Sequence, residues 1–172
     1  METTMSRRVH LLKCLFWPLL IGTVVLPSPV AADERAPSTI VFVCEHGSAK
    51  SLVATELFNR LARERGIPVR AISRAVSPQT VDARVPPALA RNMSGDGFSV
   101  ETFQPQPLSP SEAKTASRIV VVNYDGDVEA AAGAAVEHWN IGPPVTLEYQ
   151  NAKKEIAERI DALVDSLKAA PK

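Results

Sequence analysis

Downstream of residue 38, the most continuous apolar run covers residues 39–43, and an amphipathic segment, residues 52–65, follows it. A short and nearly unbroken apolar run is typical of a strand that is buried on both faces of a parallel sheet. In the second segment, apolar residues recur every four positions from Val53, which places them on one side of a helix. Gly66 predicts the end of that helix.

The rest of the chain alternates between shorter strand-like and helix-like patterns. Extended segments are expected at residues 69–72, 98–104, 118–123 and 138–141. Helices are expected from Pro86 or Pro87 to residue 92, in a short turn that begins at Ser109 or Ser111, and from residue 146 or 149 to residue 168. Residues 128–136 are rich in alanine and fit either a helix or a mobile loop.

Alternating strands and helices with short connections predict right-handed crossovers onto one parallel sheet. The expected fold class is therefore α/β, a small doubly wound three-layer sandwich with a central four-stranded parallel sheet. Such sheets bind ligands beyond the C-terminal ends of their strands. Cys44, Ser73 and Asp125 come at such ends in the predicted pattern. We expect the functional site at this edge of the sheet.

Residues 1–32 have the pattern of a cleaved signal peptide. A basic N-terminal stretch is followed by a short apolar region, residues 14–26, and then by small residues. We therefore place the cleavage after Ala32. The alternative is an uncleaved anchor, but the apolar region is short for a membrane span and contains a proline and a glycine. The sequence predicts a tether at residues 33–38, a folded domain at residues 39–169, a periplasmic or secreted location, and no stable membrane anchor after cleavage.

Composition limits the classes of partner and site. The formal net charge is zero and only 5% of the residues are aromatic, so we expect no nucleic-acid partner. Cleavage would remove Cys14 and leave Cys44 as the single cysteine, which excludes an internal disulfide in an oxidising compartment. His46, His138 and that cysteine do not have metal-site spacing, so we expect no metal and no cofactor. The sequence does not indicate an oligomeric state.

The segment from Cys44 to Ser51 carries the clearest chemical signal. Its small residues between a strand and a helix predict a loop whose backbone N–H groups hold an anion at the helix start. We interpret Cys44 as a nucleophile, because such donors and the nearby Lys50 stabilise a thiolate. The simpler alternative is a small buried apolar residue at a strand end. The predicted anion-binding residues are Glu45, His46, Gly47, Ser48, Ala49 and Lys50.

Other polar side chains have two interpretations each. His46 either acts as a cation or proton donor beside the anion, or is an exposed loop residue. Asp125 or Asp127 either supplies a general acid from a neighbouring strand end, or is a solvated carboxylate in a turn. The charged residues at positions 60 and 63–65 are expected to form a solvated helix face.

Cys44, five intervening residues, Lys50 and Ser51 resemble a motif of the low-molecular-weight phosphotyrosine protein phosphatases and the related thioredoxin-coupled arsenate reductases. That family has Cys, five residues and Arg-Ser at the end of its first strand. Further similarities lie at residues 71–73, 116–122 and 138–144. The resemblance covers roughly residues 40–167 and implies the same fold.

The resemblance also implies roles for the residues of the motif. The Cys44 thiolate would attack phosphorus or arsenic and form a covalent intermediate. Backbone N–H groups of residues 45–50 would hold the equatorial oxygens. The Ser51 hydroxyl would stabilise the thiolate.

The sequence departs from the family pattern in three ways. Lys50 replaces the arginine, so a point charge replaces a planar group that grips two oxygens. Pro143 stands where the family has the general-acid aspartate. The reductase relay uses further cysteines, which the mature chain lacks.

These observations predict an exported phosphatase-like protein that hydrolyses a phosphate monoester through a Cys44 intermediate, with reduced activity. Asp125 is the weakest member of the predicted catalytic set, which also contains Cys44, Lys50 and Ser51. The expected ligand is a small oxyanion or a phosphorylated substrate. The alternatives are a non-catalytic oxyanion-binding module, a thiol redox sensor, and an arsenate reductase that uses an external thiol.

Overall fold

The computed structural model describes residues 38–128 and 135–169. The chain divides into two units, residues 1–34 and residues 35–172, and all described residues belong to the second. The predicted signal peptide lies outside the described residues and stays a prediction. In the described parts, no helix is long and apolar enough to cross a membrane.

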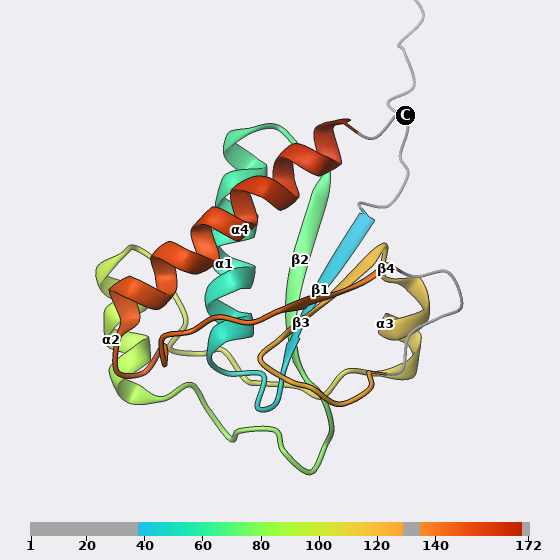
Figure 1. The fold of residues 1–172 in the computed structure, drawn as a ribbon. Helices are drawn as coiled ribbons and strands as arrows, with labels where there is room; N and C mark the ends of the chain where they lie inside the picture. The colour runs from blue at the N-terminus through green and yellow to red at the C-terminus, as the bar shows by residue number, and fades with distance from the viewer. Residues whose placement is uncertain (1–37, 129–134, 170–172) are drawn as a thin grey trace, which may run out of the picture. The chain divides into compact units, whose positions relative to one another are not determined.

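The centre of the domain is a four-stranded sheet in the order β2-β1-β3-β4 (Figure 1). All three neighbouring pairs are parallel, which confirms the predicted fold class. β1 lies in the interior of this sheet, between β2 and β3. The strands are β1 (Ser38–Cys44), β2 (Val69–Ala75), β3 (Arg118–Val122) and β4 (Ala135–Trp139).

Helices cover both faces of the sheet and make three layers. One face packs against α1, α2 and α4, and the other packs against the short α3 (Figure 1). The helices are α1 (Lys50–Glu64), α2 (Pro87–Gly95), α3 (Pro110–Thr115) and α4 (Tyr149–Ala169).

Two cores result from the alternation of side chains along β1. Ile40 and Phe42 point to the side of α1 and α4, whereas Val41 and Val43 point to the side of α3. All four side chains are fully buried. This explains why residues 39–43 read as an unbroken apolar run, since an interior parallel strand has no solvent face.

Several predicted boundaries differ from the structure. β2 continues to Ala75, three residues beyond the predicted end at residue 72, because β1 pairs with it along its full length. Residues 98–104 form no strand, and α2 extends to Gly95. The predicted start of the short helix is confirmed, since Ser109 is the N-cap of α3.

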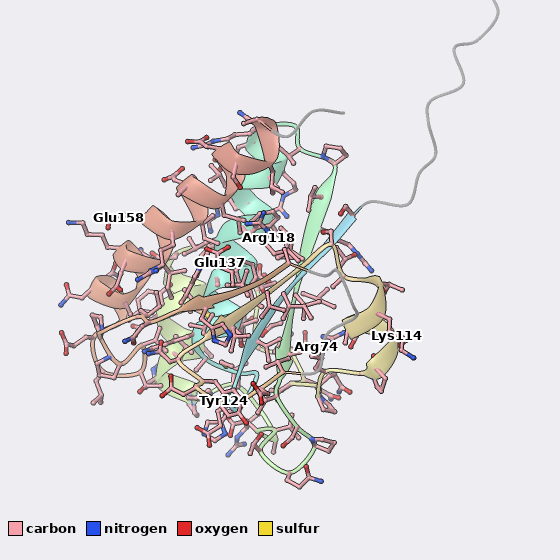
Figure 2. All side chains as sticks on the ribbon, turned by 45° about the vertical axis from the view of Figure 1, so that its right-hand side comes forward. Arg74, Lys114, Arg118, Tyr124, Glu137 and Glu158 are labelled. Carbon is pink, nitrogen blue, oxygen red and sulfur yellow. The ribbon has the colours of Figure 1, made fainter. Side chains whose placement is uncertain are left out.

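β4 was predicted at residues 138–141, but it occupies Ala135–Trp139. It is an edge strand with little apolar patterning, and four of its five residues are not buried. Its position is set by pairing with β3, where Arg118 donates to Glu137 at 3.1 Å (Figure 2). Most of the alanine-rich segment, residues 129–134, lies outside the described residues.

The prediction of a solvated face on α1 is wrong for Arg60 and Arg65. The Arg60 guanidinium lies 3.7 Å from the centre of the Phe98 ring and donates to the Asp96 carbonyl at 2.7 Å. Arg65 pairs with Asp161 at 2.5 Å and Asp165 at 2.8 Å on α4. These side chains tie α1 to neighbouring elements, which the spacing of charges along one helix does not reveal.

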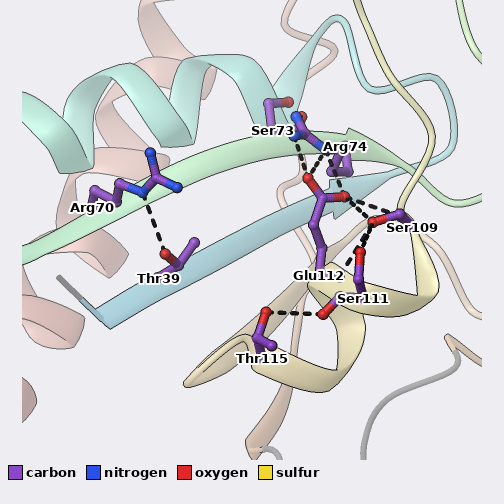
Figure 3. A network of polar contacts seen from close by, with 8 residues as sticks. All are labelled: Thr39, Arg70, Ser73, Arg74, Ser109, Ser111, Glu112 and Thr115. Atoms are coloured by element: carbon purple, nitrogen blue, oxygen red, sulfur yellow. Dashed lines mark hydrogen bonds and ion pairs between the residues drawn. The ribbon is translucent and has the colours of Figure 1, made fainter. Parts of the chain in front are cut away.

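A polar network joins the end of β2 to α3 (Figure 3). The Ser109 side chain accepts from the Glu112 N–H, and the Glu112 carboxylate accepts from the Ser109 N–H, which makes a capping box. Arg74 donates to the same carboxylate through two nitrogens. The Arg74 hydrogen bonds lower the pKa of Glu112 from 4.5 to about 2.

We expect Glu112→Gln to lower the free energy of unfolding at pH 7 by about 1–2 kcal/mol, because Arg74 loses its charged partner. Because the pKa of Glu112 is lowered by folding, this contribution is full above about pH 4.5 and disappears as the pH falls toward about 2. Urea denaturation at several pH values measures it.

Glu158→Gln, at an exposed position on α4 (Figure 2), is the matched control and should change stability by less than about 0.5 kcal/mol. An equal loss in both variants, or a Glu112→Gln loss that does not depend on pH, would contradict the role of the Arg74 pair.

Candidate active site

Cys44 is the last residue of β1, and the loop after it leads directly into α1. Its side chain is 7% exposed. The Gly47 N–H donates to the sulfur at 3.3 Å, and the Ser51 hydroxyl lies 2.9 Å from it. A sulfur that is surrounded by hydrogen-bond donors at a helix N-terminus is in a setting that stabilises a thiolate.

A chain of hydroxyl groups runs from Cys44 into β2. The Ser73 hydroxyl lies 2.8 Å from the Ser51 hydroxyl and 3.1 Å from the Gly47 carbonyl. Each hydroxyl has one hydrogen, so a Ser51 that donates to a thiolate must accept from Ser73. The Ser73 hydroxyl is the donor to Ser51, which leaves the Ser51 hydrogen free to point at the Cys44 sulfur.

Ser73 reaches this position from within β2. The sequence placed it at a strand end, but β2 continues two residues further, to Ala75. Its side chain joins β2 to the cysteine loop, so Ser73 contributes to the site although its predicted place along the strand was wrong.

The segment after β2 braces the outside of the cysteine loop. The Thr80 hydroxyl donates to the Glu45 carbonyl at 2.7 Å, and the Asp82 N–H donates to the His46 carbonyl at 3.2 Å. The buried Ser48 hydroxyl donates to the Asp82 carboxylate. Sequence reasoning missed Thr80 and Asp82, because they lie in an irregular polar segment whose only signal was its richness in turn-forming residues.

Lys50, the first residue of α1, connects the cysteine loop to the segments that follow β3 and β4 at the same edge of the sheet. Its ammonium donates to the Asn123 side-chain oxygen at 2.9 Å and to the Ile141 carbonyl at 2.6 Å. The same Asn123 oxygen accepts from the Ile141 N–H at 3.0 Å. Lys50 thus uses two of its three hydrogens to hold the loop around residue 141.

Asn123 is a site residue that sequence reasoning missed. It follows β3 with a φ of 50°, a conformation that asparagine tolerates better than most residues. An asparagine directly after a buried strand is the signal that could have identified it. Its bonds explain how one side chain orients both Lys50 and the loop at Ile141.

Burial lowers the pKa of Lys50, and the nearby Glu155 and Cys44 partly oppose that effect. Glu155 also accepts from the Gly142 N–H at 3.1 Å. The cation is therefore coupled to the cysteine on one side and to a carboxylate of α4 on the other.

A cavity of about 300 Å³ lies against Cys44. Charged and polar groups come from the cysteine loop and Asn123, whereas the opposite wall, residues 144–146, is mostly apolar. The lining residues are Cys44, Glu45, His46, Ala49, Lys50, Val122, Asn123, Pro144, Val145 and Thr146. The predicted site residues Cys44, Glu45, His46, Ala49 and Lys50 therefore come together at one cavity.

The two candidate acids near the end of β3 line other hollows. Asp125 is exposed and lines a hollow with Tyr124, His138 and Trp139. Asp127 lines a third hollow, beside α3. In the described residues, neither carboxylate lines the Cys44 cavity, and no cluster of His, Cys, Asp and Glu residues could hold a metal ion.

Comparison with known proteins identifies the class of protein that this fold and site define. Residues 39–170, which are most of the chain, match the family model for low molecular weight phosphotyrosine protein phosphatase. The chain belongs to this family. A search of curated proteins found no match.

Solved structures of similar fold include phosphatases and arsenate reductases. A thioredoxin-dependent arsenate reductase from Corynebacterium glutamicum is 18% identical, with a TM-score of 0.63, and the match covers 76% of this chain and 62% of that one. An arsenate reductase from Archaeoglobus fulgidus is 26% identical, with a TM-score of 0.58, and the match covers 73% of this chain and 98% of that one. A protein tyrosine phosphatase from Entamoeba histolytica is 11% identical, with a TM-score of 0.66, and the match covers 78% of this chain and 98% of that one.

Gly47 has a φ of 70°, and a Cβ atom there would lie 2.6 Å from the backbone nitrogen of Ala75. We expect Gly47→Ala to lower the free energy of unfolding by roughly 2–4 kcal/mol and to displace the N–H group that faces Cys44. Thermal denaturation and inorganic phosphate binding measure the two effects.

Gly66→Ala is the matched control, because Gly66 has a φ of 64° but no atom within 4 Å of an added Cβ. It should cost only about 1–2 kcal/mol of backbone strain and leave phosphate binding unaltered. If both variants bind phosphate equally well, the close approach of the loop to β2 does not shape the anion site.

Proposed function

We propose that this protein is an exported phosphoric monoester hydrolase in which Cys44 is the nucleophile. The observation that carries the proposal is the setting of the Cys44 sulfur, which is in contact with the Gly47 N–H and the Ser51 hydroxyl at the start of α1. The sulfur faces a cavity large enough for a phosphoryl group and part of its ester. Family membership supports the same chemistry.

In the proposed reaction, the Cys44 thiolate attacks phosphorus and displaces the ester oxygen. Backbone N–H groups of residues 45–50 hold the phosphoryl oxygens, and the positive end of α1 favours their charge. Lys50 adds a point charge. We expect turnover to be reduced, because a lysine binds one oxygen where an arginine binds two, and because this ammonium already donates to Asn123 and Ile141.

The expected substrate is a small oxyanion or a phosphorylated molecule, with no nucleic-acid partner. A zero formal net charge and a cavity of about 300 Å³ that Lys50 lines support this expectation. The proposed location is the periplasm or the exterior of the cell, which is supported by the signal-peptide pattern of residues 1–32.

Arsenate reduction with an external thiol is the second candidate. The same sulfur, loop and cavity suit arsenate, and the fold is shared with solved arsenate reductases. Because Cys44 is the only cysteine in the described parts of the chain, a second thiol from another molecule would have to attack the Cys44–arsenic adduct.

We expect Cys44-dependent hydrolysis of p-nitrophenyl phosphate, whose leaving group needs little help from an acid. Cys44→Ser should remove this activity and still bind inorganic phosphate, because the N–H groups and Lys50 remain. Steady-state kinetics and calorimetric titration with phosphate measure the two properties.

The outcomes separate the candidate functions. Wild-type protein that binds phosphate but does not hydrolyse the ester would be an oxyanion-binding module. Protein that binds no anion, while Cys44 is reversibly oxidised, would be a thiol sensor. Thiol-dependent turnover of arsenate without ester hydrolysis would favour the reductase.

A further inference from the structure

The leaving oxygen of a phosphate ester needs a proton, and the residue at the family's usual position for the acid is Pro143. Pro143 has no proton to give, and the residues that follow it in the cavity wall, Pro144, Val145 and Thr146, have no titratable group near neutral pH. Among the described residues that line the cavity, the titratable ones are Cys44, Glu45, His46 and Lys50. Any proton donor built into this cavity is therefore one of these four.

Three of the four are unsuited to the task. Cys44 is the nucleophile in the proposed reaction. An ionised carboxylate such as Glu45 accepts hydrogen bonds and has no proton to donate. The Lys50 ammonium donates to Asn123 and Ile141, so two of its three hydrogens are already held by fixed acceptors. Histidine, in contrast, changes charge between pH 5 and 8, where a general acid works best.

His46 is held in a defined orientation, although 51% of its side chain is exposed. Its Nδ1 lies 2.8 Å from the Thr80 carbonyl oxygen. A carbonyl can only accept, so Nδ1 carries a hydrogen and Nε2 is the nitrogen that gains or loses the proton. Thr80 is itself fixed by the bond from its hydroxyl to the Glu45 carbonyl at 2.7 Å.

The charged groups around His46 are compatible with both the protonated and the neutral form of its ring. The Glu45 carboxylate lies 3.8 Å from Nε2 and forms an ion pair with the ring when it is protonated. Cys44 and Lys50 share the cavity wall with His46, so the sulfur and an ammonium face the same space. Asp82 contacts the His46 backbone through its N–H, and its carboxylate accepts from Ser48.

We propose that His46, rather than an aspartate, is the proton donor of this site. The inference rests on the proposed hydrolase function. The Cys44 sulfur forms a bond to phosphorus, the bond from phosphorus to the ester oxygen breaks, and that oxygen takes its electron pair and the proton from Nε2. In the second step, neutral Nε2 takes a proton from water, the water oxygen bonds to phosphorus, and the sulfur leaves as a thiolate with inorganic phosphate as product.

His46→Asn tests the inference, because the asparagine amide can replace the Nδ1 donor to Thr80 while it removes the titratable nitrogen. The readout is the ratio of kcat/KM for p-nitrophenyl phosphate to kcat/KM for phenyl phosphate, whose leaving group needs a proton. We expect this ratio to rise about 100-fold or more in His46→Asn. In the wild type, phenyl phosphate hydrolysis should decline above neutral pH. This decline should be absent in His46→Asn.

His138→Asn is the matched control, because His138 is exposed and lines a different hollow. It should leave both the ratio and the pH profile as in the wild type. Equal losses on the two substrates in His46→Asn, or an unaltered pH profile, would overturn the role of His46 while the hydrolase function stands. No hydrolysis of p-nitrophenyl phosphate by the wild type would overturn the hydrolase function and this inference with it.

Discussion

The pairing of β1 with β2 on one side and β3 on the other sets the position of every group in the site. It places Cys44 opposite Ala75 and brings the ends of β1 and β3 side by side, so that Asn123 follows β3 beside the cysteine loop. Since residues 40–43 of β1 are fully buried, its register cannot shift without moving apolar side chains to the wrong face. A fixed strand end is what allows the short loop to bring the Gly47 N–H and the Ser51 hydroxyl to the Cys44 sulfur.

The cysteine loop is supported from three directions. Ser73 of β2 donates to the Gly47 carbonyl. In the segment after β2, Thr80 donates to the Glu45 carbonyl and Asp82 accepts from Ser48. Asn123, directly after β3, accepts from Lys50. These contacts hold a loop that has little apolar surface of its own. Two of these bonds end on backbone carbonyls of the loop, at Gly47 and Glu45, and two end on the side chains of Ser48 and Lys50. They give the loop a defined conformation without a bound ligand.

The sequence was sufficient for the fold and for the position of the cysteine loop between β1 and α1. Apolar periodicity identified β1 and α1, and the small residues between them identified the cysteine loop, because both signals are local in the chain. Contacts between distant segments were not predictable in this way. Asn123 and Thr80 act through hydrogen bonds to segments that are distant in the chain. β4 is placed by its pairing with β3, and Arg60 is placed by an aromatic ring on another segment.

The central claim is that the Cys44 sulfur forms a bond to phosphorus during turnover, and rapid acid quenching followed by mass spectrometry tests it most directly. Protein mixed with p-nitrophenyl phosphate and quenched within one turnover should carry a phosphoryl group on the peptide that contains Cys44. Turnover with no phosphorylated peptide at any quench time, or with the phosphoryl group on another residue, would contradict the account.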